Sequence, residues 1–129
     1  MRAMMQRDQA SAALGMIVEV DEPGHAVVSM RVRDDMLNGF AITHGGLVFT
    51  LADTAFAIAC NEDDRVTVAA GADISFLKST QAGQTLTASA VRRRVSGRNG
   101  LYDVTITDET GDVVAEFRGR SISTRRVAE

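Results

Sequence analysis

The residues from Asn38 to Cys60 constrain the fold more than any other part of this chain, because they include a run that is apolar around almost its whole circumference. After the His-Gly-Gly turn at 44–46 the run contains no Gly or Pro, and it is long enough for about four turns of helix. A helix that is apolar on every side has to be buried. We therefore expect one long helix that other elements enclose and that ends near Asn61.

One narrow polar stripe interrupts the apolar surface of this helix. Its four members fall within roughly 100° of one another at about 100° per residue: Thr50, Asp53, Thr54 and Asn61. Asp53 lies midway along the helix, where an unpaired carboxylate is costly to bury. This carboxylate is therefore either satisfied by partners, for instance across a dimer interface, or retained for chemistry.

Alternating, β-branched runs separated by turn residues dominate the rest of the chain. A short amphipathic helix is expected over 3–14, with Gly15 as its stop signal. A hairpin around the turn at 22–25 follows, and a loop over 33–43 leads to the long helix. The turn at 81–84 is expected to lead one strand directly into the next. The expected strands are 16–21, 26–32, 66–78, 85–95, 101–108 and 113–124, with further turns at 96–100 and 108–112 and a frayed tail over 125–129.

These patterns predict one α+β domain over 1–129, in which an antiparallel sheet wraps around the long buried helix. A chain of 129 residues can build one core. The net charge of −3 argues against nucleic acid as a partner, and no apolar run reaches the ~18 residues of a membrane span. The N-terminus is a poor signal peptide. A single Cys excludes an intramolecular disulfide and fits a reducing, cytoplasmic compartment.

The segment MLNGFAITHGGLVFTLADTAFAIAC, followed by DISFLK and LYDVTITDETGDVVAEFRGRS, resembles the hotdog-fold acyl-CoA thioesterases, in particular their phenylacetic-acid-degradation branch. The likeness covers about residues 10–123. Its specific part is the spacing, with Asn38 six residues before His44 and Asp53 seven residues after Gly46. The resemblance implies a hotdog fold and a dimer or dimer of dimers (a homotetramer), with two helices packed across a joined sheet.

Site roles follow from the resemblance residue by residue. The catalytic acid of the family matches Asp53, the oxyanion-binding amide matches Gly45, and the neighbouring His matches His44. An upstream Asn that holds the water or the thioester matches Asn38. Some relatives hold the nucleophilic water with a Ser or Thr on the next strand. Residues 68–71 offer no such side chain, so Thr54 is a possible substitute.

The residue types suit thioester hydrolysis on physical grounds. The amides of Gly45 and Gly46 lie in the first turn of the helix, unpaired within the helix and at the positive end of its dipole, where they can polarise a carbonyl. Asp53 can act as general base on water or attack directly as a nucleophile. Gly45 and Asp53 are eight residues apart, or about 12 Å along a helix, so one helix cannot present both to one carbonyl. Two antiparallel helices can, which predicts an obligate two-fold dimer.

Structural roles compete with these functional ones. His44 can simply cap the helix, Asn38 can simply form a turn, and Cys60 is expected in the core. Coenzyme A carries phosphates that need cations, and Arg98 beside Gly97 is the preferred residue for binding them. Other candidates are Arg92 and Arg94 on one face of their strand, Arg93 on the other, and Arg118 and Arg120. Phe40, Phe56 and Phe76 could line an acyl pocket, with Phe76 as the predicted substrate contact, or belong to the core.

The expected function is therefore that of a cytoplasmic acyl-CoA thioesterase. It would hydrolyse an aromatic acyl-CoA, of phenylacetyl or hydroxyphenylacetyl type, to free acid and CoA. No cofactor is expected, because CoA is part of the substrate and two His with one Cys make no convincing metal site. One alternative is a hotdog dehydratase or hydratase, although the polar stripe carries no His. The other is an acyl-CoA-binding module without catalysis.

Overall fold

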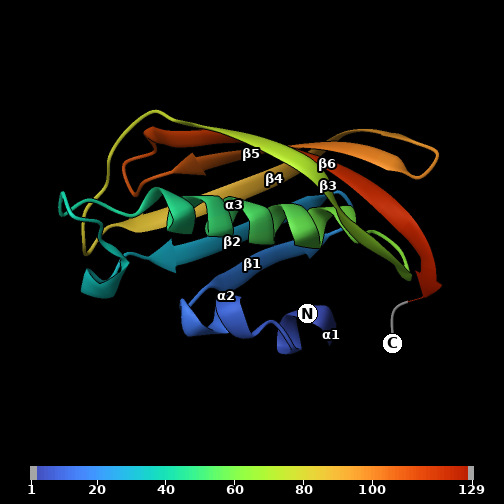
Figure 1. The fold of residues 1–129 in the computed structure, drawn as a ribbon, viewed down its shortest axis with the longest axis horizontal. Helices are drawn as coiled ribbons and strands as arrows, with labels where there is room; N and C mark the ends of the chain where they lie inside the picture. Colours follow the sequence, from blue (N-terminus) through green and yellow to red (C-terminus); the bar gives the residue numbers. More distant parts are fainter. Residues whose placement is uncertain (1–2, 128–129) are drawn as a thin grey trace.

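The computed structural model describes the backbone of residues 3–127 and the side chains of residues 3–124. A curved antiparallel sheet runs along one long helix, with two short helices near the N-terminus (Figure 1). In chain order the elements are α1 (Ala3–Gln6), α2 (Gln9–Ala13), β1 (Ile17–Glu22), β2 (His25–Arg31), the 3₁₀ turn η1 (Asp34–Met36), α3 (Gly45–Cys60), β3 (Arg65–Phe76), β4 (Thr85–Ser96), β5 (Asn99–Thr107) and β6 (Val113–Val127). The expected α+β architecture is confirmed.

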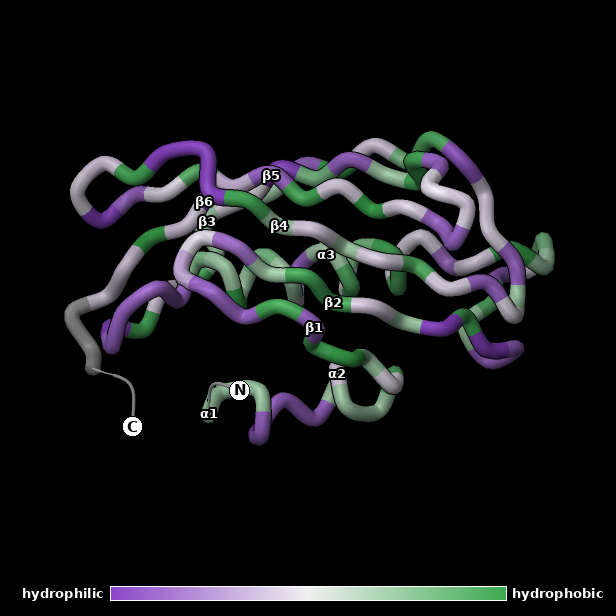
Figure 2. Tube along the Cα trace, turned by 180° about the vertical axis from the view of Figure 1, so that it is seen from behind, coloured by the Kyte–Doolittle hydropathy of each residue, from purple (hydrophilic) through white to green (hydrophobic). Residues whose placement is uncertain are grey.

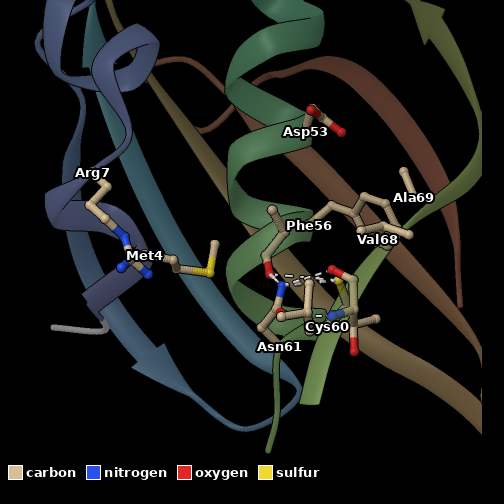
Figure 3. Close-up of a pocket in the computed structure, with 11 residues that line it drawn as sticks. Met4, Arg7, Asp53, Phe56, Cys60, Asn61, Val68 and Ala69 are labelled. Carbon is tan, nitrogen blue, oxygen red and sulfur yellow. Dashed lines mark hydrogen bonds between the residues drawn. The ribbon is translucent and has the colours of Figure 1, made fainter. Parts of the chain in front are cut away.

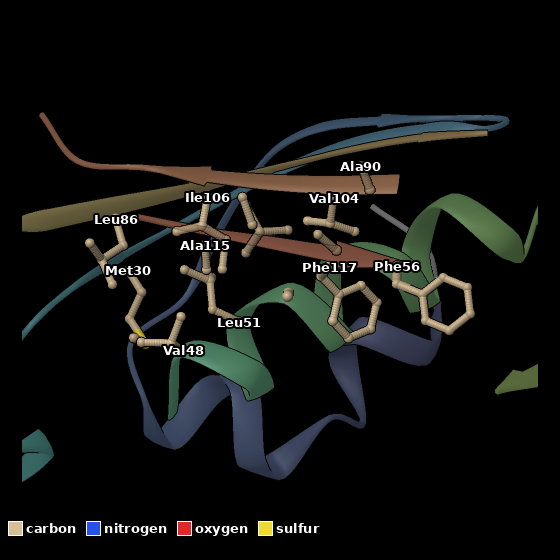
Figure 4. Packing of buried hydrophobic residues seen from close by; sticks show 14 of the residues in the cluster. Met30, Val48, Leu51, Phe56, Leu86, Ala90, Val104, Ile106, Ala115 and Phe117 are labelled. Carbon is tan, nitrogen blue, oxygen red and sulfur yellow. The ribbon is translucent and has the colours of Figure 1, made fainter. Parts of the chain in front are cut away.

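The buried helix α3 begins at Gly45 and ends at Cys60, as its apolar sequence predicts. Its side chains meet the inner face of the sheet, and hydrophobic colours run along most of its length (Figure 2). Figure 4 shows this contact for Val48, Leu51 and Phe56 of the helix and for Met30, Leu86, Ala90, Val104, Ile106, Ala115 and Phe117 of the strands. Gly119 of β6 makes room for the Phe56 ring, because a Cβ there would lie 2.7 Å from Cζ of Phe56.

The strands form one sheet in the order β1-β2-β4-β5-β6-β3, and every neighbouring pair is antiparallel. The predicted β1–β2 hairpin and the β4–β5–β6 meander are confirmed. The expectation that the turn at 81–84 joins neighbouring strands is wrong, because β3 pairs with β6 at the sheet edge. The segment that connects β3 to β4 forms backbone hydrogen bonds with other parts of the chain. Thr80 O accepts from Thr43 N at 2.9 Å, and Gln84 O accepts from Val32 N at 2.8 Å.

Two terminal expectations also need correction. The helix predicted over 3–14 is two helices, because Asp8 leaves the helical conformation (φ −80°, ψ 92°) and caps α2 by accepting from Ser11 N at 2.9 Å. Gly15, at φ +70°, ends the segment as predicted. The tail expected to fray from residue 125 instead continues β6, with Val127 paired to Arg65. Residues 128–129 lie outside the described part.

A charged clamp fixes the connection between β3 and β4. Lys78, the only Lys of the chain, contacts Asp108 at 2.6 Å and Asp112 at 2.7 Å, both in the β5–β6 turn. The Asp108 side chain is fully buried and also accepts from the Thr110 hydroxyl at 2.6 Å. The bond to Lys78, followed by that to Thr110, holds the pKa of the Asp108 carboxyl well below its usual range.

We therefore expect Asp108→Asn to lower the melting temperature by several degrees at pH 7. Because the folded pKa of Asp108 is depressed, its stabilisation is present above the unfolded pKa and is lost as pH falls towards the folded pKa. Thermal melts from pH 7 down to pH 2.5 should thus show the two proteins converging. A difference that stays constant over this range would show that the ionised clamp is not the source of the stability.

Candidate active site

The first turn of α3 offers one free backbone donor. His44 is the N-cap, and its Nδ1 accepts from Gly46 N at 2.9 Å. The amides of Leu47 and Val48 donate to His44 O at 2.9 and 3.2 Å. Within the described residues, only Gly45 N of this turn has no hydrogen-bond partner. Neither glycine amide has a partner within the helix, as expected, but the His44 side chain accepts from Gly46 N and leaves Gly45 N as the free donor.

Asn38 lies beside this donor and has a structural role as well. Its Oδ1 accepts from Phe40 N at 2.8 Å and from Ile42 N at 3.4 Å, which closes the loop before α3. The Nδ2 group makes no hydrogen bond within the described chain. Asn38 and Gly45 line one hollow of about 300 Å³. Two donors, a backbone N–H and a carboxamide NH₂, are therefore available at the same hollow.

Phe76 forms another wall of this hollow, which we call the amide hollow. A Cβ on Gly45 would lie 3.2 Å from Cζ of Phe76, so a residue without a side chain leaves room at this point. Phe76 is 55% exposed, whereas Phe40 is 86% exposed and lines no hollow described here. Phe56 is fully buried, as a core residue should be.

Asp53 lies in a different hollow, of about 550 Å³, which we call the carboxylate hollow (Figure 3). The other lining residues are mostly apolar: Met4, Arg7, Phe56, Ala57, Cys60, Asn61, Val66, Thr67, Val68 and Ala69. Asp53 is half-buried and accepts no hydrogen bond from any described residue. Burial, followed by the negative charge of Asp8, raises the pKa of the Asp53 carboxyl.

The other members of the polar stripe form hydrogen bonds within the chain. The Thr54 hydroxyl is buried and lies 2.9 Å from the Ser11 hydroxyl of α2, so it does not line the carboxylate hollow. The Thr50 hydroxyl donates to Gly46 O at 2.8 Å, and Asn61 Oδ1 accepts from Thr67 N at 2.9 Å. The role predicted for Thr54 as a water holder finds no support in this arrangement. Asp53 is the one carboxylate or hydroxyl of the stripe without such a partner.

The two hollows share no lining residue. Within one chain, the free amide of Gly45 and the carboxylate of Asp53 therefore face separate spaces. This agrees with the separation of about 12 Å that eight helical residues impose. A reaction that needs both groups at one carbonyl requires a second copy of the chain.

Comparison with known proteins decides the family. The sequence pattern of the thioesterase superfamily matches residues 40–115. The acyl-coenzyme A thioesterase PaaI of Escherichia coli is 47% identical over 120 residues, which cover 92% of this chain and 85% of that protein. The chain belongs to the thioesterase superfamily.

Solved structures show the same hotdog fold. The E. coli PaaI protein from the phenylacetic acid degradation operon matches with a TM-score of 0.95 and 42% identity, covering 98% of this chain and 92% of that one. A mutant of the phenylacetic acid degradation protein PaaI from Thermus thermophilus matches with a TM-score of 0.87 and 36% identity. The match covers 91% of this chain and 100% of that one. A Streptococcus mutans protein bound to acetyl CoA matches with a TM-score of 0.82 and 26% identity, covering 88% of this chain and 91% of that one. The resemblance and fold expected from the sequence are confirmed.

The predicted phosphate-binding residues of this thioesterase lie at a third hollow, of about 240 Å³. Gly97 and Arg98 line it at the β4–β5 turn, where Gly97 has φ +60°. Arg98 forms no ion pair among the described side chains. Arg92 is paired with Glu62, which also accepts from the Tyr102 hydroxyl. The hollow therefore holds one arginine whose charge no described carboxylate neutralises.

A β-bulge changes the predicted distribution of the neighbouring arginines. Arg92 faces Tyr102 and Arg94 faces Leu101, so the register shifts by one residue between them. Consecutive residues of β5 point to opposite faces, and so Arg92 and Arg94 do too. The expectation that they share a face is wrong. Arg93 and Arg118 pair with Asp103, and Arg120 pairs with Asp73.

The described residues form neither a metal-binding cluster of side chains nor a membrane-spanning helix. No group of three His, Cys, Asp or Glu side chains there could hold a metal ion. No helix in that part is long and apolar enough to span a membrane. Cys60 is buried at the end of α3, as expected of a core residue, and its thiol donates to Ala57 O at 3.5 Å.

The pH dependence of activity should report the environment of Asp53. A general base works only when deprotonated, so a raised pKa moves the loss of activity at low pH to a higher pH. Asp8→Asn keeps a good N-cap for α2 and removes one negative charge. We therefore expect the acid limb of the kcat/KM profile to move to lower pH in this variant. The exposed Asp34→Asn is the matched control, and a profile that is the same for all three proteins would exclude coupling between Asp8 and Asp53.

Proposed function

We propose that this thioesterase hydrolyses an aromatic acyl-CoA, of phenylacetyl or hydroxyphenylacetyl type, to the free acid and CoA. The observation that carries the proposal is the unpaired Asp53 carboxylate at the edge of a largely apolar hollow of about 550 Å³. Such a hollow suits a ring next to the reacting carbon. Similarity to PaaI proteins of phenylacetic acid degradation supports the same acyl class.

The proposed mechanism assigns each group one task. Asp53 takes a proton from a water molecule, and the resulting hydroxide adds to the thioester carbon. The carbonyl oxygen becomes negative and receives hydrogen bonds from Gly45 N and Asn38 Nδ2. The carbon–sulfur bond then breaks, the CoA thiolate leaves, and the proton on Asp53 passes to the products. His44 acts indirectly, because its bond to Gly46 fixes the turn that presents Gly45.

The proposed active unit is a two-fold dimer, which can pair further as a dimer of dimers. In it, Gly45 and Asn38 of one subunit face Asp53 of the other. The outer side of β3 is an open sheet edge, and exposed apolar side chains lie along or just beyond it: Val68, Phe76 and Leu77. Edge strands of this kind are suited to pairing with another chain. Light scattering should therefore give the mass of a dimer or tetramer.

We further propose that the enzyme is cytoplasmic, needs no metal or other cofactor, and has neither nucleic acid nor membrane as a partner. Coenzyme A is held through Gly97 and Arg98, with Phe76 against the substrate near the thioester. Activity should therefore survive dialysis against a chelator. Arg98→Gln should raise KM for acyl-CoA and leave hydrolysis of a short acyl-pantetheine thioester unchanged.

The test of this proposal is thiol release from a panel of acyl-CoAs. We expect phenylacetyl-CoA and hydroxyphenylacetyl-CoA to have higher kcat/KM than acetyl-CoA and the medium-chain aliphatic compounds. Far better turnover of medium-chain substrates would show that the acyl class is wrong. Binding of acyl-CoA without thiol release would instead indicate a binding module.

A further inference from the structure

The N-terminal segment forms one wall of the carboxylate hollow. In Figure 3, Met4 and Arg7 lie on one side of α3 and Val68 and Ala69 of β3 lie on the other, with Asp53 above them. Met4 is half-buried and packs against the core cluster. The space next to Asp53 is therefore bounded by residues far apart in the sequence.

A chain of hydrogen bonds holds this wall against α3. The Ser11 hydroxyl donates to Asp8 Oδ2 at 2.7 Å and lies 2.9 Å from the Thr54 hydroxyl. Because Ser11 uses its proton on Asp8, Thr54 donates to Ser11. Ser11 is only 3% exposed, so water competes little for these bonds. Thr54 is the residue next to Asp53, and the segment is thus fastened beside the carboxylate.

We propose that Met4 determines which acyl groups this thioesterase accepts, because its side chain closes the carboxylate hollow opposite β3. The inference rests on the proposed function, which places the acyl group in this hollow. A methionine is well suited to the position, since its flexible thioether packs favourably against aromatic rings. A smaller residue would deepen the hollow for larger acyl groups, and a bulkier one would restrict it.

Met5 provides a matched control. It follows Met4 in α1, is also half-buried and also packs against the core. It lines a separate hollow with Met16, Ile17 and Val18, and it does not line the carboxylate hollow. The same substitution at the two positions therefore perturbs the segment similarly, but only the substitution of Met4 changes the carboxylate hollow.

The experiment measures kcat/KM for 1-naphthylacetyl-CoA and phenylacetyl-CoA with the wild type, Met4→Ala, Met4→Phe and Met5→Ala. We expect Met4→Ala to raise the ratio of the first to the second by about tenfold, the range that small volume changes give in apolar pockets. Met4→Phe should lower the ratio, and Met5→Ala should leave it unchanged. Both substrates are measured on one preparation, so partial unfolding cancels from the ratio.

Three results would overturn the inference. One is a ratio that is equal in all four proteins while the wild type hydrolyses both substrates, which leaves the proposed function intact. Another is an equal shift for Met4→Ala and Met5→Ala, which would indicate general loosening of the segment. The third is the absence of hydrolysis by the wild type with any acyl-CoA, which would overturn the proposed function as well.

Discussion

Replacing Asp53 by Asn is expected to lower kcat for thioester hydrolysis by about 10²–10⁴-fold, the usual contribution of a general base. Asn has the same shape but cannot take a proton from water. KM should change little, because Asp53 has no described bond that positions a neighbour. Thiol release by wild type and variant, measured side by side with phenylacetyl-CoA, gives the ratio directly.

The stability of the variant separates this interpretation from a structural one. A half-buried carboxylate without a partner costs desolvation free energy, which a neutral amide reduces. The melting temperature of Asp53→Asn should therefore equal or exceed that of the wild type. Asp34→Asn, an exposed position, should change neither activity nor stability. Equal activity of Asp53→Asn and wild type would remove Asp53 from the mechanism and leave it a structural carboxylate.

Local patterns made most of the fold predictable. The helix α3 and the hairpins depend on apolar periodicity and on turn residues that lie within a few positions of one another. The pairing of β3 with β6 does not, because it joins residues such as Phe76 and Ala115 that are far apart in the chain. The break in the N-terminal helix was missed for a different reason: the residues around Asp8 are good helix formers, and the cap that Asp8 provides for α2 interrupts them nevertheless. An Asp followed three residues later by Ser was the available signal.

The site was predictable as residue types but not as a set of bonds. Asn38, Gly45 and Asp53 were identified through the resemblance to the hotdog-fold thioesterases, and the structure places their polar groups at two hollows. Which amide stays free depends on the ring of His44, and the sequence leaves its orientation open. The partner of Thr54 is Ser11, 43 residues away, and no local pattern connects them. Met4 carries no sequence signal at all, since only the tertiary structure brings it to Asp53.

The second large effect concerns the amide of Gly45. Gly45→Pro removes this N–H at the first position of α3, where proline is well tolerated. His44 has φ −62° and ψ 128°, a conformation that a following proline favours. We expect kcat to fall by about 10²–10³-fold, the cost of losing one oxyanion donor. Gly45→Ala keeps the N–H and adds a Cβ against Phe76, so it measures the steric part alone.

Combining Gly45→Pro with Asp53→Asn tests whether the two groups act across the dimer. The two variant chains, carrying different affinity tags, are co-expressed, and the heterodimer is purified by both tags in turn. If Gly45 of one chain serves Asp53 of the other, one of its two sites has both groups intact and the other has neither. Because the sites are equivalent by symmetry, the heterodimer should recover about half of the wild-type kcat per dimer, although each parent is nearly inactive. A heterodimer as inactive as its parents would mean that each chain supplies both groups to its own site, contrary to the separation of the two hollows along α3.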